Sequence, residues 1–331
     1  MRTAAIVGAA GYTGQETLDR LLAHPGLEVL ALGSDSSPGK HPSALDPRLG
    51  RGAGRALPTL VPNAEALASG ADVVFLCQGH EEAARTTPPA TGVVVDLSGG
   101  HRLKDPAQYA TWYGWEHPDP ASLADWCYAL AELRPPTGRL IANPGCYATA
   151  ILLALAPLRD AIDPASVVVD AKSGMTGAGR SLKASSHAGA VLENFSPYRV
   201  GTHQHQAEIE QLLGFPICFV PHLLPVRRGI VATCYAVAHD GADLRALLER
   251  AYADCPAVDV LPEGVAPELS RVQHTDMTEV NVFTDRATGR AIVIAALDNL
   301  GKGAAGQAVQ NANLALGLPP TDGLRLEGVL V

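Results

Sequence analysis

The sequence lacks clustered basic residues, long apolar runs and paired cysteines. Its 331 residues carry a formal net charge of −9 without a basic run, which argues against duplex nucleic acid as a partner, because phosphate binding needs clustered Lys and Arg. No apolar stretch approaches the roughly 20 residues of a transmembrane helix, so we expect no membrane span. The first residues, MRTAAIVGAAG, pass directly into a strand and a glycine turn, without the apolar core and cleavage site of a signal peptide.

The six cysteines form no C-x-x-C pair and have irregular spacing, which argues against a zinc site or thioredoxin-like chemistry. Without a secretion signal, we expect free thiols in a reducing cytoplasm and no bound metal. Cys218 and Cys234 lie inside apolar, β-branched runs and are predicted to pack in a core, and Cys77 ends the run DVVFLC. None of these positions gives a thiol a local reason for the lowered pKa that a nucleophile needs.

Alternating segments in the first 145 residues predict an α/β architecture. A helical pattern covers residues 13–23, and strand-like apolar runs occupy residues 3–8, 28–33, 72–77 and 92–97. Continuous apolar strands between helices are typical of a parallel sheet that is covered on both faces.

The second half has more closely spaced strands, at residues 166–171, 216–220, 229–238, 280–284 and 291–297. Helical patterns cover residues 206–213, 242–254 and 303–316. This order predicts an α+β domain with a mixed or antiparallel sheet. Two segments rich in Pro, Gly and charge, residues 34–58 and 117–138, are predicted as long loops, which are often functional.

A glycine motif, GAAGYTG, follows the first strand and opens the first helix, with glycines at Gly8, Gly11 and Gly14. Glycines permit a tight turn and let a pyrophosphate approach the backbone, and the helix start at Tyr12 and Thr13 offers free N–H groups to the anion. The spacing departs from G-x-G-x-x-G, so a purely structural turn is the alternative. The position directly after the first strand favours a dinucleotide site.

The segment after the second strand bears on which dinucleotide binds. An NAD site usually has an acidic residue at the end of that strand to bond the ribose 2′-OH. Here the strand runs into SDSSPGK, where Asp35 favours NAD only if its side chain points inward. The same segment contains four candidate partners for a 2′-phosphate, which favours NADP. They are Ser34, Ser36, Ser37 and Lys40.

One cysteine differs from the rest, because Cys146 in NPGCYATAILLAL lies where a helix is predicted to begin. Pro144 and Gly145 end the preceding strand, and an apolar helix follows. A thiolate at a helix N-terminus is stabilised by the helix dipole and unpaired N–H groups, which lowers its pKa. The same N–H groups would stabilise an oxyanion on an attacked carbonyl. A buried structural cysteine is the alternative that this local pattern leaves open.

A nucleophilic cysteine needs an acid/base partner, and the candidates are His203 and His205 in GTHQHQAEIEQLL, just before a predicted helix. Alternating histidines can also bind a metal, but no third ligand with suitable spacing is evident. Exposed polar residues are the other alternative.

Together, several segments resemble the N-acetyl-gamma-glutamyl-phosphate reductase family, relatives of aspartate-semialdehyde dehydrogenase, in order along essentially the whole chain. They are GAAGYTG, NPGCYATA, KSGMTGAGRS, GTHQHQAEI, PVRRGIVATCYA and DNLGKGAAGQAVQNANLALG. Two loops depart from the family pattern: DLSGGHRLKD, from Asp96, differs from DLSADFRLKD at Gly99, Gly100 and His101, and LCQGH, which contains Gln78, replaces LPHG.

The resemblance implies a mechanism. Cys146 attacks an acyl phosphate, phosphate leaves a thioester, and NADPH reduces that thioester to a semialdehyde. His205 is implied as the acid/base, with His203 as the second candidate and a substrate contact. The implied substrate-binding residues further include Arg102, Ser173, Gly174, Arg180 and Arg227. In addition to the glycine motif, the implied cofactor-binding residues include Gly177 and Asn299. Each assignment has a structural alternative. The segment SGMTGAGR, which contains Ser173 to Arg180, could be a flexible turn; Arg227 could lie at an exposed strand end; and Asn299 could cap a helix.

The resemblance also implies the organisation: a Rossmann-type NADP-binding domain (residues 1–145 with 303–331) and a catalytic and oligomerisation domain (residues 146–302). We expect a small-molecule acyl phosphate substrate and a homodimer or homotetramer. Three alternatives stay open: the same chemistry on a carrier-protein-linked acyl phosphate in lysine biosynthesis, aspartate-semialdehyde dehydrogenase, and a non-enzymatic NADP-sensing protein. The GTHQHQ and DNLGKG segments argue against the second, and a sensor would not need Cys146.

Overall fold

The computed structural model describes residues 1–180 and 188–328 and forms two compact units. The first contains Met1–Ala110, Gly114–Pro144 and Ala304–Leu324, and the second contains Thr111–Tyr113, Gly145–Gly303 and the segment that starts at Arg325. That last segment was expected with the first unit. It lies with the second, because the Arg325 N–H donates to the carboxylate of Asp276 (2.8 Å) and the Asp276 N–H donates to the Arg325 carbonyl (2.7 Å).

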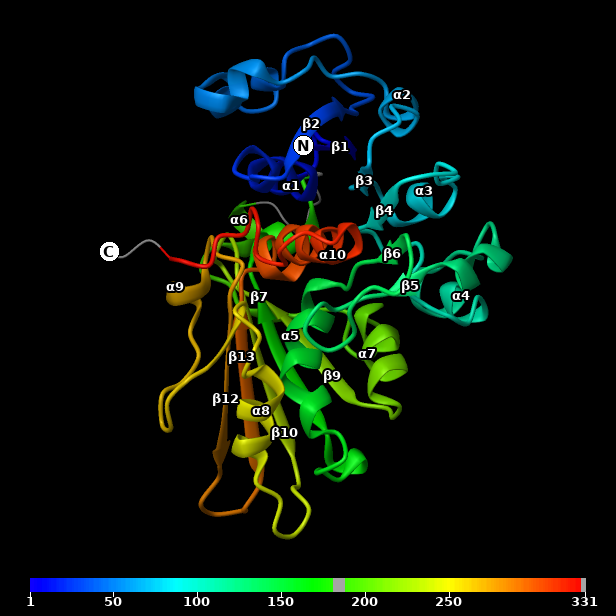
Figure 1. Ribbon diagram of the computed structural model, residues 1–331. Coiled ribbons are helices and arrows are strands. Elements are labelled where there is room, and N and C mark those ends of the chain that lie inside the picture. Colours follow the sequence, from blue (N-terminus) through cyan, green and yellow to red (C-terminus); the bar gives the residue numbers. More distant parts are fainter. Residues whose placement is uncertain (181–187, 329–331) are drawn as a thin grey trace. The chain divides into compact units, whose positions relative to one another are not determined.

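The first unit is built on a six-stranded sheet with the order β2-β1-β3-β4-β6-β5, in which every pair is parallel (Figure 1). Its strands are β1 (Arg2–Val7), β2 (Leu27–Leu32), β3 (Val73–Leu76), β4 (Val93–Asp96), β5 (Cys127–Tyr128) and β6 (Leu140–Ala142). The predicted parallel sheet is confirmed, and its first four strands lie within one residue or two of the predicted strand segments.

Helices of the first unit are α1 (Tyr12–Leu22), α2 (Asn63–Leu67), α3 (His80–Ala84) and α10 (Gly306–Leu316), and α4 (Ala107–Tyr113) begins in this unit. On one sheet face, Ile6 and Phe75 pack in a buried cluster with Leu18 of α1 and Val309 of α10. The last helix of the chain therefore belongs to the core of the first unit. The predicted loop 34–58 contains three short 3₁₀ helices, Pro42–Ala44, Pro47–Gly50 and Gly52–Ala56.

The second unit has a seven-stranded sheet with the order β11-β12-β13-β10-β7-β9-β8 (Figure 1). The pairs β7–β9 and β11–β12 are parallel and the others antiparallel, which confirms the predicted mixed sheet. Its strands are β7 (Val168–Ser173), β8 (Ser196–Pro197), β9 (Cys218–Leu223), β10 (Ile230–Ala236), β11 (Val258–Val260), β12 (Thr278–Thr284) and β13 (Ala291–Leu297). Its helices are α5 (Cys146–Leu155), α6 (Ala188–Val191), α7 (His205–Leu213), α8 (Leu244–Tyr252) and α9 (Leu269–Val272).

Burial alternates along the strands of the second sheet, because α5 packs against one face of β10 and β13. Cys234 of β10 points to the covered face and is buried, as predicted. The prediction for Cys218 is wrong, since this residue begins β9 on the other face and is exposed. Within residues 1–180 and 188–328, no helix has the length and apolar character needed to cross a membrane.

Candidate active site

Cys146 is the first residue of α5, and the predicted helix start is confirmed. Gly145, the N-cap, has an extended backbone (φ −71°, ψ 154°) that turns the chain from β6 into the helix. The other residues of α5 are buried, whereas Cys146 is partly exposed. Its sulfur thus lies where the first N–H groups of a helix have no intrahelical acceptor.

A buried carboxylate links the start of α5 to His205, the first residue of α7. One oxygen of Glu208 accepts a hydrogen bond from the Gly145 N–H (3.1 Å), and the other lies 3.7 Å from His205 Nε2. Residues three apart share a helix face, so α7 presents His205 and Glu208 together. Glu208, which is fully buried, was not among the predicted site residues. The only signal was its spacing in HQAE.

His203 has a different environment from His205. Its Nδ1 accepts the His205 N–H (3.1 Å), and its ring packs edge-on against Tyr147, Tyr198 and Phe219. Burial, with a smaller contribution from the positive charge of Arg199, lowers the pKa of His203 to about 3. The ring is therefore neutral near pH 7, which favours His205 over His203 as a residue that exchanges protons.

Two phenols complete this cluster. Tyr198 donates to the Tyr147 hydroxyl (3.1 Å), which donates to the His222 carbonyl (3.1 Å). Burial is the main cause that raises the pKa of both tyrosines, that of Tyr198 to about 12, and the nearby charge of a Cys146 thiolate adds to it. The surroundings of Cys146 thus hold neutral phenols. Among the described residues, no group of three or more His, Cys, Asp and Glu side chains is arranged to hold a metal ion.

The segment 173–179, called the substrate loop below, lies on the turn before β10. Backbone N–H groups of Gly174, Met175 and Thr176 donate to carbonyls of Gly229, Val226 and Arg227 at 2.9–3.0 Å. A Cβ on Gly174 would lie 2.7 Å from the Arg228 nitrogen, so only glycine permits this approach. Ser173 is buried at the end of β7.

Four predicted site residues in or near this loop have different environments. Arg227 and Arg180 are exposed. The amide of Asn299 accepts from the Gly229 N–H (2.7 Å) and donates to Thr176 Oγ1 (3.0 Å), so it fixes the substrate loop. Gly177 lies beside it, since a Cβ there would be 3.9 Å from Asn299 Nδ2. Ser181, the last residue of the KSGMTGAGRS motif, lies outside the described residues.

The glycine motif has the geometry of an anion cradle. Gly8 has φ +86°, and a Cβ there would lie 2.7 Å from the Cys77 carbonyl oxygen. A Cβ on Gly14 would lie 2.5 Å from the Gly8 oxygen. Gly11 is the N-cap of α1, so Tyr12 and Thr13 begin the helix and present its first N–H groups. The close backbone packing at Gly8 and Gly14 fits a pyrophosphate cradle.

The segment after β2 fits a phosphorylated ribose better than a ribose 2′-OH. Asp35, which would favour NAD, accepts hydrogen bonds from the Asn63 backbone N–H (2.8 Å) and side-chain amide (2.9 Å). The side-chain amide oxygen of Asn63 in turn accepts from the Gly8 N–H (3.0 Å). The Asp35 carboxylate therefore stabilises the local backbone through its hydrogen bonds to Asn63. Lys40 is exposed, and Ser34 is buried with its hydroxyl 3.2 Å from that of Ser36.

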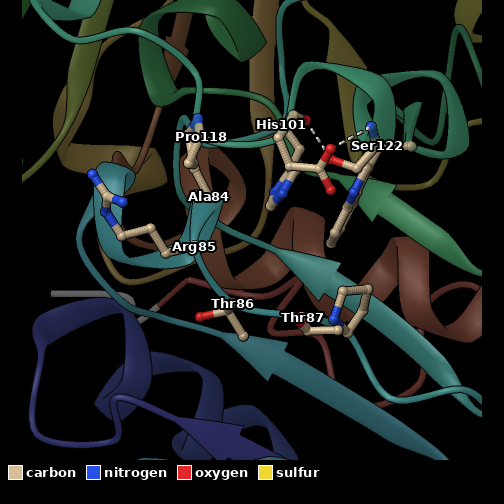
Figure 2. Close-up of a pocket in the computed structure, with 10 residues that line it drawn as sticks. Ala84, Arg85, Thr86, Thr87, His101, Pro118 and Ser122 are labelled. Carbon is tan, nitrogen blue, oxygen red and sulfur yellow. Dashed lines mark hydrogen bonds between the residues drawn. The ribbon is translucent and has the colours of Figure 1, made fainter.

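Arg102 is buried in the first unit, where it donates to the carbonyls of Asn143 (2.8 Å) and Leu97 (2.9 Å). Nearby, His101 stands where the family pattern has phenylalanine. Its ring stacks on Trp126 at 3.8 Å, and its Nδ1 lies 2.6 Å from the Asp96 carboxylate. His101 lines a cavity of about 330 Å³ with residues such as Arg85 and Ser122 (Figure 2). This cavity contains neither Cys146 nor the histidine pair.

A nucleotide-type parallel sheet, a mixed sheet and a cysteine at a helix start define the semialdehyde dehydrogenase class. Residues 3–139 match the family described as the semialdehyde dehydrogenase NAD binding domain, and residues 146–299 match its dimerisation domain. The chain is 46% identical to the N-acetyl-gamma-glutamyl-phosphate reductase of Salinispora arenicola over 98% of each chain. It is 43% identical to that of Geobacter sp. strain M21 over 98% of this chain and 99% of the other. The chain belongs to the N-acetyl-gamma-glutamyl-phosphate reductase family, as its motifs predicted.

Solved structures agree on the fold. Aspartate semialdehyde dehydrogenase II of Vibrio cholerae, complexed with ASA, has a TM-score of 0.74 at 19% identity and covers 96% of this chain and 98% of its own. Aspartate semialdehyde dehydrogenase with NADP from Candida albicans has a TM-score of 0.63 at 17% identity, covering 96% and 99%. These matches show the two-domain fold alone.

Proposed function

We propose that the protein uses NADPH to reduce N-acetyl-L-glutamyl 5-phosphate to N-acetyl-L-glutamate 5-semialdehyde and phosphate, a step of arginine biosynthesis. The observation that carries this proposal is the position of Cys146 at the start of α5, joined through Gly145 and Glu208 to His205. The family relationship supplies the substrate, and the cradle of Gly8 and Gly14 supports the cofactor. We place the reaction in the cytoplasm, where six free thiols stay reduced.

The proposed chemistry begins with attack of the Cys146 sulfur on the acyl carbonyl. A C–S bond forms, the C–O bond to phosphate breaks, and phosphate leaves with the electron pair. The first N–H groups of α5 stabilise the oxyanion of this step. Bound NADPH supplies the hydride that reduces the thioester carbonyl. The hemithioacetal then releases the aldehyde and returns the sulfur as a thiolate. His205 holds the proton exchanged with the sulfur, and Glu208 orients its ring.

We assign binding roles on the same basis. The first unit binds NADPH through the glycine motif, with Ser34 and Lys40 toward the 2′-phosphate. The second unit carries catalysis, with the exposed Arg180 and Arg227 and the substrate loop toward the anionic groups of the substrate. Gly177 is part of this loop, and Asn299 fixes the loop through Thr176. His203 is proposed to support the site from a buried position, and the predicted substrate contact of Arg102, which is buried within the first unit, stays a prediction.

The decisive assay is phosphate-dependent reduction of NADP⁺ with N-acetyl-glutamate semialdehyde. We expect activity with this substrate and much less with aspartate semialdehyde. Folded protein that binds NADP without turnover would favour the sensor instead. Activity only on a carrier-linked substrate would favour the lysine-biosynthetic variant, for which the net charge of −9 gives a poor docking surface to an acidic carrier.

Substitution of Gly14 tests the cofactor cradle. Gly14→Ala places a Cβ 2.5 Å from the Gly8 oxygen and 2.8 Å from the Ala9 Cα, which forces the turn open. We expect the Kd for NADPH to rise at least about tenfold, because pyrophosphate binding depends on close backbone approach. Fluorescence titration of NADPH measures this. Gly138→Ala is the matched control, since a Cβ there meets nothing within 4 Å. An unchanged Kd in folded Gly14→Ala would move the pyrophosphate elsewhere.

We further propose a homodimer that forms through the sheet face opposite α5. Registered pairs place Tyr235 beside Val168 and Ile292 on this face, and Val168 and Ile292 are exposed or half-buried. The same face carries Val220, Val231 and Ile294. The face also carries the ion pair of Lys172 and Asp170. Its apolar side chains, in a segment that matches a dimerisation domain, fit burial against a second copy of the chain.

Substitution on β10, the central strand of this sheet, tests the dimer. We expect Tyr235→Glu to give the mass of a single chain in light scattering at concentrations where the unsubstituted protein has a higher mass. A carboxylate buried in an apolar interface without a partner is strongly unfavourable. Leu30→Glu, which changes an exposed apolar residue of β2 in the first unit, should leave the mass unchanged. Equal masses for Tyr235→Glu and the unsubstituted dimer would place the interface elsewhere.

A further inference from the structure

Asp298, directly after β13, is fully buried and accepts hydrogen bonds on both carboxylate oxygens. Oδ1 accepts the N–H groups of Leu300 (2.9 Å) and Gly301 (3.1 Å). Oδ2 accepts the Arg228 Nε–H (2.6 Å) and the His274 N–H (2.5 Å). Four donors converge on one acceptor-only group, which is the arrangement that an ionised carboxylate requires when buried.

The N–H groups on one side of Asp298 belong to Leu300 and to Gly301, the first residue of a π-helical turn, Gly301–Ala305. Turns of this kind are rare in proteins, and those that occur often lie at functional sites. The Gly303 N–H donates to the Asp298 carbonyl (2.9 Å). A Cβ on Gly303 would lie 2.9 Å from the Cβ of Cys146, and one on Gly301 would lie 2.1 Å from the Thr275 oxygen. The turn is thus packed directly against the nucleophile.

On its other side, Asp298 holds Arg228, whose backbone is the surface on which Gly174 and the substrate loop lie. The next residue, Asn299, ties Thr176 of that loop to Gly229. One short segment, DNLGKG, therefore contacts both the nucleophile and the substrate loop.

We propose that Asp298 is a positioning residue for the proposed reaction: its carboxylate fixes the π-helical turn that supports Cys146 and fixes Arg228 beneath the substrate loop. Through these contacts, the buried Asp298 carboxylate fixes the position of the Cys146 sulfur relative to the substrate loop. The inference rests on the proposed role of Cys146 as the nucleophile. It assigns no contact between Asp298 and the substrate.

Asp298→Asn is the sharpest change, because it keeps the size of the side chain. An amide has one acceptor oxygen and one NH₂ group, so on one side of the side chain an NH₂ would face two N–H donors. Loss of the negative charge alone would favour a thiolate at Cys146, whereas loss of position would disfavour it. The two effects have opposite signs, and the reactivity of Cys146 separates them.

The experiment measures iodoacetamide labelling of Cys146 against pH in the full chain, by mass spectrometry, with a cysteine peptide in the same tube as an ordinary thiol. We expect the ratio of Cys146 to peptide labelling at pH 7 to fall about tenfold in Asp298→Asn. We expect kcat to fall about a hundredfold, as for a nucleophile displaced by an ångström. Gly303→Ala, which pushes directly on Cys146, should lower the same ratio with Asp298 intact.

Glu279→Gln is the matched control. Glu279 is a largely buried carboxylate of β12 that accepts from Arg271 and the Glu268 N–H, and its variant should keep the labelling ratio. Folded Asp298→Asn and Gly303→Ala with an unchanged or higher ratio would overturn the proposal; if Asp298→Asn does not fold, Gly303→Ala decides. Turnover of the unsubstituted protein tests the proposed function separately, because the labelling ratio needs no substrate.

Discussion

Cys146→Ser is expected to lower kcat by at least about 10³-fold, because a serine hydroxyl at neutral pH is a far weaker nucleophile than a thiolate. An oxygen ester, if formed, would also be a poorer hydride acceptor than a thioester. The position at the start of α5 favours a negatively charged sulfur but does not ionise a hydroxyl. Phosphate-dependent NADP⁺ reduction measures the loss, and fluorescence titration should show that NADPH still binds, since the glycine motif belongs to the first unit.

Cys255→Ser is the control for this substitution. Cys255 follows α8, and its thiol donates to the backbone oxygen of Ala251 (3.8 Å). Its variant should retain full turnover. If Cys146→Ser kept activity within about tenfold, covalent catalysis at this residue would be ruled out and the cysteine would have a structural role.

The parts of the fold that the sequence predicted are those that short-range patterns determine. β3, β4 and the AAIV part of β1 are nearly continuous apolar segments that are buried, and such segments have few alternatives to a buried strand. β5 was missed because Cys127–Tyr128 is only two residues long and forms a strand through pairing with β6. Cys218 was misplaced because an apolar run does not show which face of a sheet each side chain takes.

The features of the candidate site also separate into local ones, which the sequence predicted, and long-range ones, which it did not. The glycine cradle and the helix start at Cys146 are local features, so a few neighbouring residues were enough to predict them. Glu208 and Asp298 act on partners 63 and 70 residues away, Gly145 and Arg228 respectively. Nothing near either acidic residue in the sequence indicates those partners. The roles of such residues follow only from the tertiary pairing of α5 with α7 and of β13 with β10.

The histidine pair shows how burial separates two residues that look alike in sequence. His205→Asn should lower kcat by about 10²- to 10³-fold, the usual contribution of a positioned acid/base, and His203→Asn should lower it much less. His203 stays neutral near pH 7 because burial lowers its pKa to about 3, and its Nδ1 already accepts the His205 N–H. His205 instead lies 3.7 Å from the buried carboxylate of Glu208, which can stabilise its charged form.

Steady-state assays of both variants between pH 6 and 9 measure this difference. Asparagine keeps a polar side chain at each position, so thermal unfolding should show whether either variant has lost its fold before the rates are compared. In His205→Asn, the limb of the pH profile that reports the acid/base should disappear, whereas His203→Asn should keep it. The reverse order of effects would make His203 the proton-exchanging residue and leave His205 to orient it through the bond between its N–H and the His203 ring.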